Sequence, residues 1–79
     1  MRHDIKLPSL GEETEDSAVV TFWLVKLDDE VRKGDDLVEL STDKAAFTLP
    51  SPRRGRLVET LVEEGDEVRV GDVLCVLES

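Results

Sequence analysis

Short runs rich in valine and leucine alternate with turn residues along the whole chain. The runs are four to eight residues long, the usual length of a strand, and Gly, Pro and paired acidic residues separate them. They span residues 18–25, 37–40, 45–49, 57–62 and 73–77. Because none has the length and periodicity of an amphipathic helix, the pattern predicts an all-β sandwich or barrel.

An internal repeat accounts for most of this pattern. Residues 25–40 match residues 62–77 at an offset of 37, with nine identities in sixteen positions. The repeated apolar positions are predicted to face inward as four pairs: Val25 and Val62, Val31 and Val68, Leu37 and Leu74, and Leu40 and Leu77. A second match, at an offset of 42, places residues 7–9 over residues 49–51, so the first half should carry about five extra residues between Ser9 and Ala18.

Neither half of the repeat can bury its own apolar face. Two facing copies would form a flattened barrel or sandwich of two similar antiparallel sheets related by a quasi-twofold axis. The turn at Thr42, Asp43 and Lys44 links the halves, and its counterpart is the place where the two termini meet. Lys44 should therefore lie on a hairpin opposite the termini, with the extra residues of the first half beside it.

Composition and charge narrow the class of function. The 79 residues suffice for one domain, residues 1–79, whose thin core leaves no room for a deep cavity, so a surface site is expected. The net charge of −9 disfavours nucleic-acid and membrane surfaces as partners. No apolar run has the length of a signal peptide or a membrane span, which predicts a cytoplasmic protein, or one of the mitochondrial matrix for a domain excised from a eukaryotic chain.

The residue types needed for catalysis or metal binding are scarce. Cys75 lies within the apolar run of residues 73–77 and is expected to be an inert core residue. His3 is the sole histidine, and near the start of the chain it is expected to be exposed. With no base, nucleophile or ligand set in a plausible arrangement, neither a catalytic nor a metal site is predicted.

Four motifs stand out along the chain: Asp43-Lys44-Ala45, Lys6-Leu7-Pro8-Ser9-Leu10-Gly11-Glu12, Trp23-Leu24-Val25 and Glu64-Gly65-Asp66-Glu67-Val68-Arg69-Val70-Gly71. Together they resemble the lipoyl domain, the carrier module of 2-oxo acid dehydrogenase complexes. The resemblance covers essentially the whole chain. It implies that Lys44 carries lipoic acid in amide linkage, with Thr42, Asp43 and Ala45 shaping the turn and its recognition.

The resemblance also implies a function and a set of partners. The domain would be a carrier without catalysis of its own, in a parent chain that is a dihydrolipoamide acyltransferase. A lipoate ligase or lipoyl transferase would modify it. The lipoylated side chain of Lys44 would then act as a long arm that visits the active sites of a thiamine-dependent 2-oxo acid dehydrogenase, the acyltransferase core and dihydrolipoyl dehydrogenase in turn. The isolated domain is expected to be monomeric.

Two alternative functions stay open at this point. A biotinyl carrier domain shares the fold, but there methionines flank the lysine, whereas Asp43 and Ala45 flank Lys44 and the only methionine is Met1. An unmodified β interaction module would need only the repeat and the acidic surface.

The sequence departs from the lipoyl pattern at Asp28, Ser41 and Ser17. Asp28 stands where glycine is common, and aspartate should tolerate a positive φ there.

The acidic residues between the first two strands form a separate hypothesis. Four carboxylates fall within five positions: Glu12, Glu13, Glu15 and Asp16. Since the extra residues should lie beside Lys44, they are predicted to be a docking element for the partner dehydrogenase. A solvated connection without such a role is the alternative.

Overall fold

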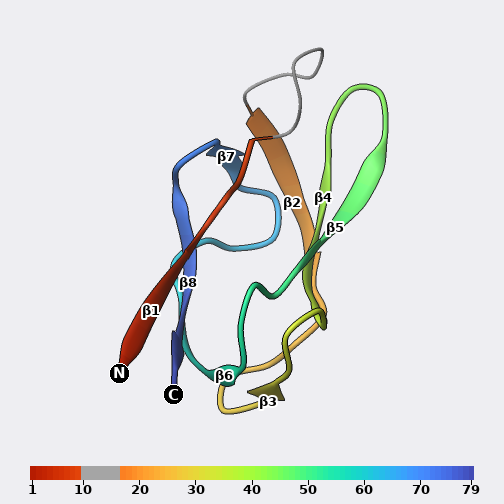
Figure 1. Cartoon of the computed structure of the whole chain (residues 1–79). Coiled ribbons are helices and arrows are strands. Elements are labelled where there is room, and N and C mark those ends of the chain that lie inside the picture. Colours follow the sequence, from red (N-terminus) through yellow and green to blue (C-terminus); the bar gives the residue numbers. More distant parts are fainter. Residues whose placement is uncertain (10–16) are drawn as a thin grey trace.

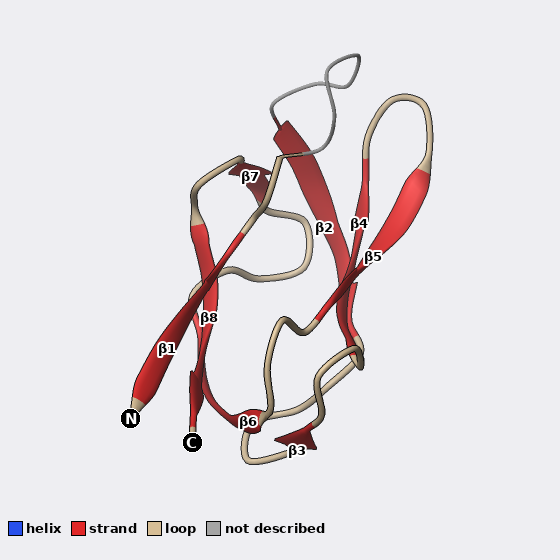
Figure 2. Ribbon diagram, viewed as in Figure 1, coloured by secondary structure: helices blue, strands red, loops and turns tan. Residues whose placement is uncertain are grey.

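The computed structural model describes residues 1–9 and 17–79, which form eight strands and no helix (Figures 1 and 2). The strands are β1 (Arg2–Lys6), β2 (Ser17–Trp23), β3 (Glu30–Val31), β4 (Asp36–Ser41), β5 (Ala46–Pro50), β6 (Gly55–Thr60), β7 (Glu67–Arg69) and β8 (Val73–Glu78). The five predicted runs correspond to β2, β4, β5, β6 and β8. The all-β prediction is confirmed.

The strands form two four-stranded antiparallel sheets. One has the order β1-β8-β6-β3 and the other β5-β4-β2-β7. Each sheet combines strands from both halves of the repeat, so neither half could form its sheet alone. The two sheets face each other as a flattened sandwich, with the aliphatic side chains between them (Figure 2).

The quasi-twofold relation is visible in the strand registers. Val20 lies opposite Leu40 in the β2–β4 ladder, and Leu57 lies opposite Leu77 in the β6–β8 ladder. These two pairs are related by the offset of 37 found in the sequence, and each ladder carries a β-bulge directly after the pair. The duplicated pattern of residues therefore became a duplicated pattern of backbone pairing.

The second predicted match is wrong by two residues. Ile5 lies opposite Cys75 in the β1–β8 ladder, and Leu49 lies opposite Val38 in the β5–β4 ladder. Because Cys75 and Val38 are counterparts at the offset of 37, Ile5 and Leu49 are also counterparts, at an offset of 44 and not 42. The first half is consequently seven residues longer than the second, where five had been expected.

The core consists almost entirely of Val and Leu side chains from both halves. Of the predicted inward pairs, three are fully buried: Val31 and Val68, Leu37 and Leu74, and Leu40 and Leu77. Val25 and Val62 are half-buried and pack against this cluster. Cys75 has no exposed surface, as expected for a core residue.

The two acidic turns are built by the same contact. Asp29 Oδ2 accepts the backbone N–H of Lys26 at 2.8 Å, and Asp66 Oδ2 accepts that of Glu63 at 2.8 Å. An aspartate that accepts an amide three residues earlier closes a turn without help from the core. The same contact recurs in the next pair of turns, from Arg32 to Asp35 and from Arg69 to Asp72.

The two ends of the sandwich are also counterparts. Ser79 N–H donates to the Met1 carbonyl at 3.0 Å, and Thr42 N–H donates to the Ala45 carbonyl at 2.9 Å. The place where the termini meet is therefore the counterpart of the β4–β5 hairpin, and the two lie at opposite ends of the molecule (Figure 1). His3 is partly exposed, and its Nε2 lies 2.9 Å from the Ser79 hydroxyl at the surface.

Candidate functional site

The tip of the β4–β5 hairpin is a four-residue turn held by its threonine. The ladder ends at Ser41 opposite Ala46, and Thr42 then closes the turn onto Ala45. The Thr42 Oγ1 donates to the Ala45 carbonyl at 3.3 Å and accepts the Lys44 N–H at 3.3 Å. A short hydroxyl side chain that bonds to its own turn fixes the backbone on either side of Lys44.

The β4–β5 hairpin, whose turn contains Lys44, lies at the far end of the molecule from the termini (Figure 1). Asp43, Lys44 and Ala45 are exposed, and Thr42 is half-buried. Within residues 1–9 and 17–79, Lys44 forms no ion pair. The turn therefore presents a primary amine on a fixed backbone, with room for another molecule to reach it.

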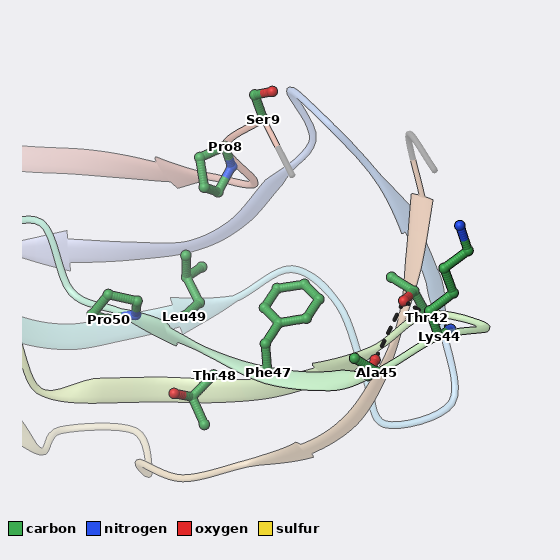
Figure 3. Close-up of a pocket in the computed structure, with 9 residues that line it drawn as sticks. All are labelled: Pro8, Ser9, Thr42, Lys44, Ala45, Phe47, Thr48, Leu49 and Pro50. Atoms are coloured by element: carbon green, nitrogen blue, oxygen red, sulfur yellow. Dashed lines mark hydrogen bonds between the residues drawn. The ribbon is translucent and has the colours of Figure 1, made fainter. Parts of the chain in front are cut away.

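An apolar groove of about 330 Å³ lies along one side of the hairpin (Figure 3). Phe47 and Leu49 of β5 point into it, and Pro8 and Ser9, which follow β1, lie across from them (Figure 3). β1 and β5 are the edge strands of different sheets, so the groove follows one opening of the sandwich. We call this feature the arm groove. Its described lining is Pro8, Ser9, Thr42, Lys44, Ala45, Phe47, Thr48, Leu49 and Pro50.

The other side of the hairpin has a smaller and more polar hollow. It measures about 170 Å³ and lies between the hairpin and the first residues of β2. Asp43 and Glu67 contribute carboxylates to its lining, and Ser17 and Ser41 contribute hydroxyls. Lys44 thus stands between an uncharged surface and an acidic one.

The structure brings together the four residues predicted around the attachment position, Thr42, Asp43, Lys44 and Ala45, at one turn. The four predicted docking carboxylates, Glu12, Glu13, Glu15 and Asp16, lie outside the described residues, and their role stays a prediction. The described residues on either side of that segment, Ser9 and Ser17, line the two hollows beside the hairpin.

The sequence did not point to Phe47 as part of the site. The signal was present, because Phe47 is one of three aromatic residues and follows the lysine by three positions. Its alternation with Leu49 places both side chains on one face of β5, while Thr48 points away from them (Figure 3). What the sequence could not supply was the opposite wall at Pro8 and Ser9, which comes from the other sheet.

Other kinds of site find no support in the described part of the chain. No group of three or more His, Cys, Asp or Glu side chains there could hold a metal ion. Burial raises the pKa of the Cys75 thiol to about 11, which keeps it protonated and poorly nucleophilic at neutral pH. Over the same residues, no helix is long and apolar enough to cross a membrane.

Comparison with known families agrees with this geometry. A model of the biotin/lipoyl family, described as "Biotin-requiring enzyme", matches residues 3–77. This chain belongs to the biotin/lipoyl family. This family includes both lipoyl and biotinyl domains. The relatives in sequence and in structure are therefore needed to distinguish the two.

The sequence relatives are components of 2-oxo acid dehydrogenase complexes. The dihydrolipoyllysine-residue acetyltransferase of the pyruvate dehydrogenase complex from Bacillus subtilis is 38% identical over all 79 residues. The dihydrolipoyllysine-residue succinyltransferase of the 2-oxoglutarate dehydrogenase complex from Bartonella vinsonii is 40% identical over the same length. The chain covers only 18% and 19% of these two proteins. It therefore spans about a fifth of the length of these curated relatives.

Solved structures give the same result. The lipoyl domain of the 2-oxoglutarate dehydrogenase complex from Azotobacter vinelandii superposes with a TM-score of 0.74 at 29% identity, covering 96% of this chain and 95% of that one. A multi-domain long-chain acyl-CoA carboxylase reaches 0.74 at 23% identity over 7% of its own length, which shows a shared fold alone. The predicted lipoyl domain is confirmed, the biotinyl alternative is not favoured, and the domain is a carrier and not an enzyme in itself.

Proposed function

We propose that Lys44 carries lipoic acid in amide linkage and that the domain moves acyl groups between the active sites of a 2-oxo acid dehydrogenase complex. The observation that carries the proposal is the position of Lys44, exposed at a hairpin tip opposite the termini, within Asp43-Lys44-Ala45. A long arm attached there would extend away from the chain's own attachment points.

The residues of the turn fit a covalently attached carboxylic acid. Lys44 offers a primary amine with no ion-pair partner among the described residues, and the Thr42 hydroxyl holds the backbone that presents it. In the modification the neutral Nζ attacks the carboxyl carbon of an activated lipoyl donor on the modifying enzyme. The new C–N bond replaces the bond to the activating group, which leaves as one amine proton is lost. Asp43 and Ala45 are the exposed neighbours that such an enzyme would read.

The lipoyl group would supply a dithiolane that takes up an acyl group as a thioester and is oxidised and reduced. The chain itself supplies position. A rigid sandwich holds the base of the arm, and attachment of the domain to its parent chain raises the effective concentration of the arm at each active site. Because the turn is fixed by its own hydrogen bonds, the arm would begin at the same point in every encounter.

The proposed partners are those that the resemblance to lipoyl domains implies. They are a lipoate ligase or lipoyl transferase, a thiamine-dependent 2-oxo acid dehydrogenase, an acyltransferase core and dihydrolipoyl dehydrogenase. We propose a dihydrolipoamide acyltransferase as the parent chain, residues 1–79 as one monomeric domain within it, and the cytoplasm or mitochondrial matrix as its location. The names of the relatives in Bacillus subtilis and Bartonella vinsonii support the acyltransferase parent.

The test is intact mass after expression with a lipoate ligase and lipoate. One lipoyl group should be added, and peptide mapping should find it on Lys44. Lys44→Arg should abolish the addition, whereas Lys26→Arg, an exposed lysine in another turn, should not change it. Modification of the Lys44→Arg variant would refute the assignment, and no addition to any variant would favour the unmodified interaction module. Addition of biotin by a biotin ligase would favour the biotinyl alternative.

A further inference from the structure

We propose that the arm groove is a docking site for the domain's own lipoyl arm, which lies along Phe47, Leu49 and Pro8 between visits to the partner active sites. The inference rests on the proposed attachment at Lys44 and adds an interaction to it. The arm would then exchange between a docked and an extended state.

The first argument is chemical complementarity. Charged residues make up 37% of the chain, yet Lys44 is the only charged residue in the described lining of the groove. Acylation would convert the Lys44 amine to a neutral amide and leave that lining without a formal charge. The remaining lining is one aromatic ring, aliphatic and proline carbons, and a few hydroxyls. Such a surface suits an apolar chain that ends in a dithiolane and disfavours a charged occupant.

The second argument comes from the quasi-twofold axis, which provides an internal control. Phe47 and Pro50 line the groove, and their counterparts at the offset of 44 are His3, near the termini, and Lys6. The fold therefore accepts polar and charged residues at these positions. The apolar side chains of Phe47 and Pro50 are therefore not required by the backbone arrangement, whereas Leu49, whose counterpart is Ile5, belongs to the core.

The third argument concerns size and affinity. The volume of about 330 Å³ is at the lower end of the range for small-molecule sites, which fits one short chain and ring. Because Lys44 is itself part of the lining, a group attached to it has an effective concentration of about the millimolar order at the groove. A contact with a dissociation constant near the millimolar order would therefore suffice to hold the arm for about half of the time.

The experiment uses NMR on the domain whose Lys44 modification has first been confirmed by mass. We expect nuclear Overhauser contacts between the lipoyl methylene protons and the Phe47 ring, with the arm signals shifted from those of free lipoamide. Free lipoamide added to the unmodified domain should perturb Phe47 and Leu49, with half-saturation near the millimolar order.

Two variants and one control make the test specific. Phe47→His introduces the residue found at the counterpart position, and Pro50→Lys places an ammonium group at the exposed edge of the groove. Both should reduce the arm contacts several-fold while lipoylation still occurs. The control, His3→Phe, makes the reverse change at the other end and should leave the contacts unchanged. If Phe47→His fails to fold, Pro50→Lys alone carries the comparison, since Pro50 is exposed.

The outcomes separate this inference from the proposed function. A lipoylated Lys44 whose arm signals match free lipoamide, with no contact to Phe47, overturns the docked state and leaves the attachment intact. Contacts that grow with protein concentration mean that the groove takes the arm of a second copy, which also overturns the intramolecular docking. Absence of modification at Lys44 refutes both proposals.

Discussion

The hairpin end and the terminal end of the sandwich share a backbone arrangement and differ in their side chains. At both ends one amide closes the last pair of strands, from Thr42 to Ala45 and from Ser79 to Met1, at 2.9 and 3.0 Å. At the hairpin end the chain is continuous and carries the exposed Lys44 beside the apolar arm groove, whereas the counterpart of this turn is the place where the two termini meet. The repeat therefore provides the structure of both ends, whereas the candidate chemistry depends on side chains at one of them.

The outer faces of the two sheets differ in the same way. On the sheet that contains the termini, Arg56 pairs with Glu78 across neighbouring strands at 3.6 Å. The counterparts of these residues on the other sheet are Val19 and Ser41, and Val19 is 39% exposed. Exposed ion pairs contribute little to stability, so their replacement on the other sheet costs the fold little. The surface near the hairpin was thus free to diverge.

The strongest test of the comparison is to damage the shared core on each side. Leu40→Ala and Leu77→Ala remove counterpart side chains with no exposed surface. Each should lower the free energy of unfolding by about 2–5 kcal/mol, because it leaves a cavity between the sheets. Urea denaturation measures both. An unchanged midpoint for either variant would contradict a core shared equally by the two halves.

A difference within the core should appear only at alkaline pH. Cys75 is the counterpart of Val38, and burial raises the pKa of its thiol to about 11. The folded domain keeps this proton when the unfolded chain has lost it, so stability should fall as the pH rises from about 9 to about 11. Cys75→Val has no thiol to titrate, so near pH 11 its free energy of unfolding should fall by up to about 3 kcal/mol less than that of the wild type.

The measurement is the difference in unfolding free energy between wild type and Cys75→Val across that pH range, since the two proteins differ only at this side chain. At pH 7 the two should differ little, because valine already occupies the counterpart position. Equal pH dependence in the two proteins would show that the thiol does not couple to folding.

A smaller effect is expected where the two acidic turns differ. Asp28 has φ 73° and its counterpart Gly65 has φ 94°, so both occupy the left-handed region. A Cβ at Gly65 would meet nothing within 4 Å, and Gly65→Ala should therefore cost only the conformational penalty of about 1–2 kcal/mol. Asp28→Gly removes the penalty of a side chain in the left-handed region and should stabilise the domain by about 0.5 kcal/mol. The gain is small because glycine also has more freedom in the unfolded chain, which opposes it.

Thermal unfolding of these two variants checks both signs. Gly34→Ala provides a control in another turn with the same conformation, at φ 93° and with an equally open site, and it should cost the same as Gly65→Ala. A neutral Gly65→Ala would mean that the turn adjusts its backbone when a side chain is added.

The smallest effect on stability is expected from the segment that only the first half possesses. Replacing Glu12, Glu13, Glu15 and Asp16 by their amides should leave the melting temperature nearly unchanged. If the segment is a docking element, reductive acylation by a partner dehydrogenase should slow a few-fold at low ionic strength and become less sensitive to salt. An unaltered rate would identify it as a solvated connection.

The strands were predictable because each half must bury an apolar face, and the repeat of residues 25–40 in residues 62–77 marks that requirement twice. The short strands β3 and β7, of two and three residues, are not among the five predicted runs, because so few residues show no alternation. β3 pairs with β6, β7 pairs with β2, and the two ladders are counterparts at the offset of 37. Tertiary pairing, and not local sequence, therefore creates these two strands.

The offset of 42 failed for a physical reason. Side chains of a strand alternate with a period of two, so an offset of 42 and one of 44 give the same inward and outward faces. The shared leucines, Leu7 and Leu49, are therefore both buried although they are not counterparts, whereas Ser9 is exposed and Ser51 is buried. The hydrogen bonds decide the register, since Leu7 and Ser51 donate to the counterpart carbonyls of Asp72 and Asp35.

The pairing of β1 with β8 has a consequence for how the chain reaches this structure. Arg2 lies opposite Glu78, and β8 is the neighbour of β1 in its sheet. The first of the eight strands to be synthesised can therefore pair only after the last of them has been made. Contacts between residues so far apart in sequence slow folding, because a long loop must close before they form. The β4–β5 hairpin needs only a four-residue turn. The end that carries Lys44 can therefore form early, while the end that joins the termini closes last.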